Sequence, residues 1–308
     1  MKERSLIIDT DPGQDDAIAI LLALASDELQ IDAITTVAGN VPQPLVTDNA
    51  HGLLALTGRE DIPVHRGCER PMLRELFTAE YVHGPTGVDG TELPEASVAT
   101  SSKHGVDAII DYCLGAEDGS VTLCPVGPLT NIGMAIAKEP KIIPRIREIL
   151  WMGGAFTEPG NTTELAEFNA YVDPHAAHVV FTSGVPLTIF PLDVTHRALM
   201  LPRHIEALDA FGTDVAVAAV GMLRFYERYD VDKYDIAGAP LHDPCVIAYL
   251  VDPTLFTGHA AHVAIDHVNE ETIGNTYEIA DAEPNATIMT EVDAERFFDL
   301  VVQRVGSL

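Results

Sequence analysis

The sequence is poor in positive charge and in cysteine, and it has no long apolar run. Of its 308 residues, 18 are lysine or arginine and 47 are aspartate or glutamate, so the formal net charge is −29. Such a chain repels nucleic acid and anionic membranes, and we expect neither as a partner. No apolar stretch reaches the roughly 18 residues of a membrane-spanning helix. The first residues, MKERSLIIDTDPG, do not read as a secretory signal, so we expect a cytoplasmic protein.

Lysine and cysteine are both scarce in the sequence. Only five lysines occur, and an acidic, lysine-poor surface is typical of proteins that stay dissolved in concentrated salt. We therefore hypothesise a salt-rich cytoplasm. Among the four cysteines there is neither a CxxC pair nor the spacing of a zinc site. Cys113, Cys124 and Cys245 lie in apolar segments, which predicts reduced, buried thiols.

Strand and helix patterns alternate along the N-terminal half. Apolar segments suited to buried strands occur at 5–9, 29–37, 121–126 and 146–152, and helix-forming segments occur at 14–25, 44–56, 106–114 and 131–138. This alternation predicts an α/β fold with an open, mostly parallel twisted sheet flanked by helices. Further along we expect helix over 202–229, strands with turns over 261–290 and a last helix over 292–305. With no internal repeat or linker, residues 1–308 are expected to form one domain.

Four carboxylates follow the first predicted strand within eight residues, in the segment Asp9-Thr10-Asp11-Pro12-Gly13-Gln14-Asp15-Asp16. Acidic residues at a helix N-terminus are favoured as caps, which explains one or two of them. Four packed carboxylates repel one another unless a cation neutralises them. Oxygen ligands without Cys or His suit a hard ion, calcium or magnesium. A metal site and a capping cluster both remain open for this segment alone.

Two Asp-Pro steps predict helix starts, Asp173-Pro174 and Asp243-Pro244, with the aspartate as N-cap and the proline in the first helical turn. For Asp243 there is a second interpretation. Its carboxylate would supply another metal oxygen, with His242 beside it as a proton donor, because histidine suits proton transfer near neutrality.

The segment 151–174 combines a close-approach turn with polar side chains. The turn is Met152-Gly153-Gly154, and Asn161, Glu167 and Asn169 follow it. Glu167 and Asn169 are two residues apart, so in an extended segment both would point the same way. A carboxylate and an amide on one side would bind sugar hydroxyls. An ordinary polar loop is the alternative.

Seven motifs, spread over most of the chain, together point to one family: DTDPGQDDA at 9–17, TTVAGN at 35–40, HGPTG at 83–87, PVGPLTNIGMA at 125–135, MGGAF at 152–156, GNTTELAEFNAYVDP at 160–174 and HDPC at 242–245. In this order they resemble the inosine-uridine preferring ribonucleoside hydrolases. The resemblance implies the nucleoside hydrolase fold with a Rossmann-like core. It also implies calcium-dependent cleavage of the bond between ribose and nucleobase, a small ribonucleoside as substrate, and a homo-oligomer, either dimer or tetramer.

The resemblance implies a role for each matching residue. Asp11 corresponds to the general base that also touches calcium and the attacking water. His242 corresponds to a histidine beside the base and is our candidate for assisting its departure. The other implied calcium ligands are Asp16, Asp243 and the main-chain carbonyl of Val126.

Contacts to the substrate are implied in the same way. Asp15 and Asn169 correspond to residues that bind the ribose hydroxyls, and Asn161 and Glu167 to residues at the 5′-hydroxyl end. Three more positions complete the implied pocket: Asn40 near the water and ribose, Met152 along the sugar, and His83 beside the base.

Base preference is not readable from the sequence. Purine-specific members of the family hold the base between tryptophans, whereas the single tryptophan here is Trp151 and position 83 is histidine. This favours inosine, uridine or broad specificity. Tyr229 or Tyr234 is expected near the base, but the loop expected between 225 and 241 does not align well enough to choose between them.

Two other functions compete with hydrolysis. A phosphatase of the haloacid dehalogenase type also begins with a strand and DxD, which Asp9-Thr10-Asp11 resembles, but Gly13 stands where that family has Thr or Val. A catalytically silent nucleoside-binding protein would need no general base, so the presence of Asp11 beside every implied ligand argues against it.

Overall fold

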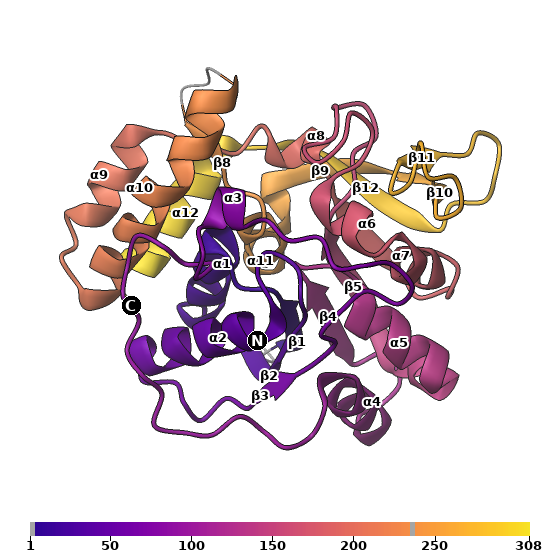
Figure 1. Ribbon diagram of the computed structural model, residues 1–308, viewed down its shortest axis with the longest axis horizontal. Helices are drawn as coiled ribbons and strands as arrows, with labels where there is room; N and C mark the ends of the chain where they lie inside the picture. The colour runs from indigo at the N-terminus through magenta and orange to yellow at the C-terminus, as the bar shows by residue number, and fades with distance from the viewer. Residues whose placement is uncertain (1–3, 235–237) are drawn as a thin grey trace.

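A sheet of eight strands forms the centre of the molecule (Figure 1). The computed structural model describes residues 4–234 and 238–308, with the side chains of 229–234 left aside. The strand order is β3-β2-β1-β4-β5-β6-β12-β9. Neighbouring strands run parallel except β9, which is antiparallel to β12. The predicted open, mostly parallel sheet with flanking helices is confirmed.

The observed elements follow the predicted segments closely. Three strands of the central sheet, Val64–Arg66, Leu187–Phe190 and Phe256–Ala261, fell outside the predicted strand segments, apart from the last residue of the third. The strands are β1 Arg4–Thr10, β2 Leu29–Thr36, β3 Val64–Arg66, β4 Val121–Pro125, β5 Ile146–Met152, β6 Leu187–Phe190, β7 Leu199–Met200, β8 Ala239–Pro240, β9 Phe256–Ala261, β10 Val263–Ile265, β11 Thr276–Glu278 and β12 Ala286–Val292. The helices are α1 Gln14–Leu24, α2 Gln43–Thr57, α3 Glu80–His83, α4 Gly105–Gly115, α5 Thr130–Lys138, η1 Pro140–Arg145, α6 Phe168–Val172, α7 Pro174–Phe181, α8 Leu192–Thr195, α9 Pro202–Asp209, α10 Asp214–Tyr234, α11 Pro244–Val251, η2 Pro253–Leu255 and α12 Ala294–Gly306.

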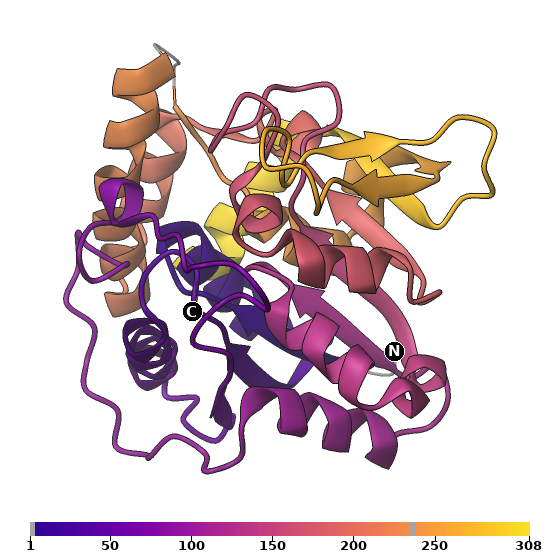
Figure 2. The ribbon, with the colours of Figure 1, turned by 45° about the vertical axis from the view of Figure 1, so that its right-hand side comes forward.

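The sheet separates two hydrophobic cores. Successive strand residues point to opposite faces, so Leu6 and Ile8 of β1 lie in one core and Ile7 lies in the other. Helices α1, α2, α10, α11 and α12 cover the first face, and α4, α5 and α7 cover the second (Figure 2). Because both faces are buried, the strands are apolar almost throughout, which is why they were readable in the sequence.

The prediction of helix over 202–229 holds for most of the segment, but the helix is not continuous. Two helices, α9 and α10, occupy this region, and Gly212 lies between them with a left-handed φ of 65°. Glycine adopts this conformation without steric penalty, so the helix ends there. Helix α10 then continues to Tyr234, through part of the segment expected to be a loop.

Strand order reverses beside β1, and this places the polar motifs together. From β1 the chain builds β2 and β3 on one side and then crosses to β4 on the other side. In open α/β sheets, ligands bind beyond the carboxyl ends of the strands at such a reversal. Asp11 follows the end of β1 and Val126 follows the end of β4. Among the described residues, no helix is both long and apolar enough to cross a membrane.

Candidate active site

The turn between β1 and α1 directs the first carboxylates. Asp16 lies in the first turn of α1 and its side chain accepts hydrogen bonds from the Gly13 amide at 3.0 Å, the Asp11 amide at 3.2 Å and the Thr10 hydroxyl. The capping interpretation therefore holds for Asp16. Asp9 is held elsewhere, because its carboxylate accepts from Thr35 and from Asn131. Burial, against these hydrogen bonds, raises the pKa of Asp9 to about 7.

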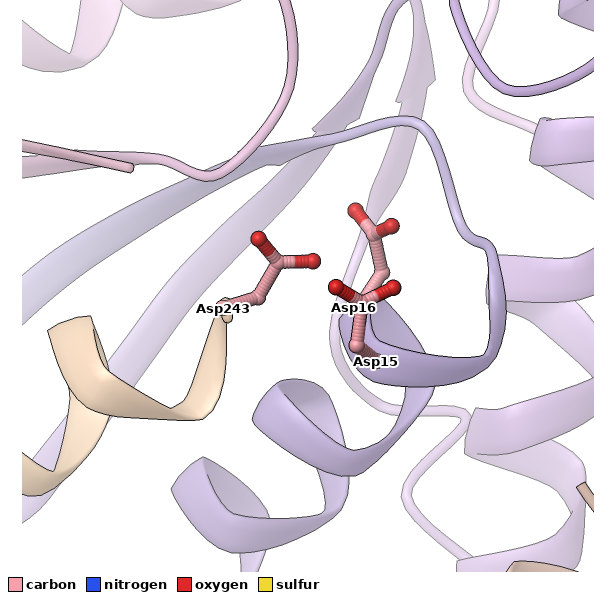
Figure 3. A group of neighbouring side chains, drawn as sticks. All are labelled: Asp15, Asp16 and Asp243. Carbon is pink, nitrogen blue, oxygen red and sulfur yellow. The ribbon is translucent and has the colours of Figure 1, made fainter. Parts of the chain in front are cut away.

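The side chain of Asp243 converges with those of Asp15 and Asp16, although more than two hundred residues separate Asp243 from this adjacent pair in the chain. Each offers a carboxylate oxygen, and these oxygens all lie within 4.8 Å of one another (Figure 3). All three side chains are buried. Asp243 occupies the N-cap position of α11 but makes no capping hydrogen bond, and its carboxylate is directed toward Asp15 and Asp16. The cap prediction for the Asp243 side chain is therefore wrong.

Asp11 is buried next to this group. Its Oδ2 accepts a hydrogen bond from the Asn40 amide at 2.7 Å, while its Oδ1 is buried with no hydrogen-bond partner among the residues that the structure describes. Burial, and then the charges of Asp16, Asp15 and Asp9, hold the pKa of Asp11 well above its usual range. Burial and the charges of Asp15, Asp16 and Asp11 do the same for Asp243.

Two glycines enclose the Asp11 carboxylate. A Cβ atom on Gly39 would lie 2.0 Å from Asp11 Oδ2, and one on Gly127 would lie 2.3 Å from Oδ1. Real atoms do not approach this closely, so any side chain at either position would displace the carboxylate. These glycines are required for space, since neither has a positive φ.

The donor set fits a hard divalent cation. Three buried carboxylates with raised pKa values, those of Asp11, Asp16 and Asp243, and one Asp11 oxygen with no hydrogen-bond partner among the described residues call for compensating positive charge. The Val126 carbonyl lines the same cavity and also accepts a hydrogen bond from Asn169 Nδ2 at 2.9 Å. Oxygen ligands alone are the preference of Ca²⁺ and Mg²⁺. The converging group consists of the implied ligands Asp16 and Asp243 together with Asp15, and Asp11 is buried near enough for the charges of Asp16 and Asp15 to raise its pKa.

A cavity lies over this group, with about 690 Å³ of space when the part open to solvent is included. Of the residues predicted for the site, all line it except Asp11 and Asp16, which lie beneath it. The predicted residues that line it are Asp15, Asn40, His83, Val126, Met152, Asn161, Glu167, Asn169, His242 and Asp243.

Glu167 and Asn169 both reach the cavity, but not from an extended segment as predicted. Asn169 lies in helix α6 and Glu167 is its N-cap. The Glu167 carboxylate accepts from the amides of Asn169 at 2.8 Å, Ala170 at 3.0 Å and Gly154 at 2.9 Å. Burial nevertheless raises its pKa to about 7. Asn169 donates to the carbonyls of Val126 and Met152, so it ties α6 to the ends of β4 and β5.

Two histidines, His83 and His242, line the cavity. His83 stacks on Tyr226 with ring centroids 5.7 Å apart, and its Nδ1 lies 2.7 Å from Gln14 Oε1. His242 Nδ1 lies 2.7 Å from the Thr195 hydroxyl. Burial lowers the pKa of each histidine to about 3. Both rings are therefore neutral near pH 7, which suits donation of a hydrogen bond better than transfer of a full proton.

Several lining residues were missed from the sequence, and Tyr226 and His196 are the most informative. Tyr226 lies one helical turn before Tyr229 on α10. It also lies four residues after Met222, which is buried, so helical spacing would have placed Tyr226 on the same inward face. His196 follows α8, and no motif marked it. The side chains of Tyr229 and Tyr234 lie outside the described part of the chain, so the question between them stays open. The others that were missed are Ala79, Tyr81, Val82, Thr162 and Phe168.

Comparison with known proteins gives the same family. Residues 6–299 match the family described as inosine-uridine preferring nucleoside hydrolase. A pyrimidine-specific ribonucleoside hydrolase RihA of Photobacterium profundum is 43% identical over 99% of both chains.

Two solved structures agree along nearly their whole length. A plant nucleoside hydrolase superposes with a TM-score of 0.93 at 33% identity, covering 99% of both chains. A purine-preferring ribonucleoside hydrolase of Gardnerella vaginalis gives 0.93 at 31% identity, covering 99% of this chain and 98% of that one. The phosphatase and the silent binding protein are thereby set aside. The chain belongs to the inosine-uridine preferring nucleoside hydrolase family, and its reaction is hydrolysis of the N-glycosidic bond of ribonucleosides.

Proposed function

We propose that the enzyme uses Ca²⁺, held by Asp11, Asp16, Asp243 and the Val126 carbonyl, with Asp15 beside them. The observation that supports this most directly is the convergence of buried carboxylates with raised pKa values under the cavity. When bound, the cation would polarise a water molecule and hold the ribose 2′ and 3′ hydroxyls. Asp11 has one buried oxygen with no hydrogen-bond partner among the described residues, so we assign it the proton of that water.

The remaining lining residues would position the nucleoside. Positive charge builds on the ribose as the glycosidic bond breaks, and the buried carboxylates stabilise it. We assign Asp15, Asn40 and Asn169 to the ribose hydroxyls, Met152 to the sugar face, and Asn161 with Glu167 to the 5′ end. These contacts supply orientation, which lowers the barrier without any covalent step.

His83 and His242 would receive the departing base. With pKa values lowered by burial to about 3, both rings are neutral near pH 7. We therefore infer that His242 assists departure by donating a hydrogen bond. The ring stack of His83 on Tyr226 provides a flat aromatic surface on the same side of the cavity.

Pyrimidine ribonucleosides are the substrates we propose. The support is the 43% identity to a RihA hydrolase named as pyrimidine-specific, together with the position of Trp151. Trp151 is fully buried against Phe181 in the second core, so it cannot hold a purine base. The expected order of turnover is uridine or cytidine above inosine.

The test is turnover of uridine, cytidine and inosine with release of free base and ribose as readout. Activity should fall on removal of divalent ions by a chelator and return with Ca²⁺. Asp11→Ala should lower turnover about 100-fold or more, the scale of general-base catalysis. Wild-type turnover in chelator, or in Asp11→Ala, would overturn the proposed mechanism.

Four properties beyond the reaction complete the proposal. We infer that residues 1–308 act as one domain, since both cores share one sheet. The four free thiols suit a reducing compartment such as the cytoplasm.

A homo-oligomer, dimer or tetramer, is proposed from the family resemblance alone and would be tested by light scattering. The net charge of −29 supports the salt-rich cytoplasm, which unchanged folding and activity between dilute buffer and molar salt would contradict.

A further inference from the structure

The 153–167 loop joins β5 to α6 and carries part of the cavity wall. Asn161, Thr162 and Glu167 of this loop line the cavity. Its two ends are fixed, because the Gly154 amide donates to Glu167 and the Thr276 hydroxyl bonds to the amide and the carbonyl of Ala155. Residues 157–159 are exposed. These exposed residues need a further contact to hold them in place.

Asp193 holds residues 156–158 of the loop. It lies in α8, is 6% exposed, and accepts hydrogen bonds from three consecutive loop amides, Phe156 at 2.9 Å, Thr157 at 2.7 Å and Glu158 at 3.2 Å. The Thr157 hydroxyl donates to the same carboxylate. Burial acts to raise the pKa of Asp193, but these hydrogen bonds outweigh it and lower the pKa. The group is thus a charged anchor, and hydrogen bonds to charge are the stronger kind.

Residues next to Asp193 connect this anchor to the base side of the cavity. The Thr195 hydroxyl lies 2.7 Å from His242 Nδ1. His196 lines the cavity, its Nδ1 is 3.7 Å from the Glu158 carboxylate of the loop, and its ring centroid is 5.8 Å from that of His242. One short segment, 193–196, therefore touches both the loop and the histidine proposed to assist the base.

We propose that Asp193 is a positioning residue that fixes the 153–167 loop so that Asn161 and Glu167 meet the 5′ end of the nucleoside. The inference rests on the proposed function, which assigns the 5′ hydroxyl to that loop. Asp193 lies outside the acidic group of Asp15, Asp16 and Asp243, so its effect falls on substrate binding rather than on water activation. Without the anchor, substrate would have to order the loop as it binds, and affinity would fall.

The test compares uridine with 5′-deoxyuridine in wild type and in Asp193→Asn. Asparagine keeps the size but loses the charge and turns an amide toward the loop donors. For uridine we expect KM to rise about 10-fold while kcat changes less than about 3-fold. For 5′-deoxyuridine, which has no hydroxyl for the loop to bind, the variant and wild type should have similar KM. A merely structural defect would affect both substrates equally.

Asp266→Asn is the matched control. Asp266 also anchors a loop by accepting from two backbone amides, Val268 and Asn269, and from the Thr272 hydroxyl, but none of these residues lines the cavity. It should leave KM for uridine unchanged. If Asp193→Asn does not fold, Thr157→Val removes only the hydroxyl contact and carries the same comparison with a smaller KM change.

Failure of the proposed function and failure of the role of Asp193 would give different results. Absence of turnover by the wild type with uridine, cytidine and inosine would contradict the proposed function itself. Normal wild-type turnover with an unchanged KM in Asp193→Asn, or an equal KM rise for both substrates, would overturn the role of Asp193 alone.

Discussion

The two Asp-Pro steps of this chain look alike in sequence and behave differently in the structure. Asp173 caps α7 by accepting from the Ala176 amide at 3.0 Å, and it also accepts from the Met72 amide and the Thr130 hydroxyl. Asp243 makes no capping bond and faces Asp15 and Asp16. The backbone explains the difference, since φ and ψ are −137° and 74° at Asp173 but −66° and −36° at Asp243. Helical dihedrals at Asp243 turn its carboxylate away from the amides of its own helix.

Within this pair, Asp173 is structural because backbone and side-chain donors occupy its oxygens, whereas Asp243 is available for chemistry because it makes no capping bond and faces other carboxylates. Both side chains are buried, so burial alone does not distinguish them. The distinguishing observation is what occupies their oxygens. The following changes would break or sharpen this distinction.

Asp243→Asn should have the largest effect. Removing this carboxylate takes away a proposed calcium ligand, so kcat/KM should fall roughly 100- to 1,000-fold. Because it also relieves repulsion with Asp15 and Asp16, the free energy of unfolding without calcium should not fall. Steady-state kinetics and denaturant unfolding in chelator would measure both. Wild-type turnover, or a large loss of stability with normal turnover, would place Asp243 in the structural class.

Calcium should stabilise the protein against unfolding through the same residues. At 100 times the dissociation constant a ligand of the folded state adds about 2.7 kcal/mol to its stability. The shift in thermal midpoint should appear in wild type and in Asp173→Asn but be absent in Asp243→Asn. Equal shifts in all three proteins would show that calcium binds elsewhere.

Asp173→Ala should lower the free energy of unfolding by about 1–2 kcal/mol, because alanine cannot accept the capping hydrogen bond. The Met72 and Thr130 contacts tie α7 to neighbouring segments, which adds to the loss. Turnover at a temperature well below the midpoint should stay within about 3-fold of wild type, since Asp173 does not line the cavity. Loss of activity without loss of stability would be the opposite of this expectation.

Glu167 should give the smallest effect, a change in how stability depends on pH. Burial raises its pKa from 4.5 to about 7 in the folded protein. The stability linked to its proton is complete below about pH 4.5 and is lost as pH rises through about 7. Glu167→Gln removes this titration, so the free energy of unfolding should fall less between pH 5 and 8 than in wild type. Parallel pH profiles would show that Glu167 is not the titrating group.

Much of the fold was readable because the strands are largely apolar and some helices, such as α7, begin at a side-chain cap. The carboxyl ends of β1 and β4 meet, so Asp11 and Val126 could be expected to lie together from topology. Local pattern failed where tertiary contacts decide the conformation. Glu167 caps a five-residue helix that no pattern marked, and His196 enters the cavity from a four-residue helix. Short helices like these depend on their surroundings more than on propensity.

Gly39 and Gly127 have a consequence for how the site tolerates change. They border the Asp11 carboxylate on two sides. A Cβ atom added to Gly39 would lie 2.0 Å from one of its oxygens, and one added to Gly127 would lie 2.3 Å from the other. The carboxylate of Asp11, the proposed general base, is thus held in one orientation before substrate binds. One uncharged methyl group at either glycine, without altering a single polar atom, would be enough to push that oxygen out of line.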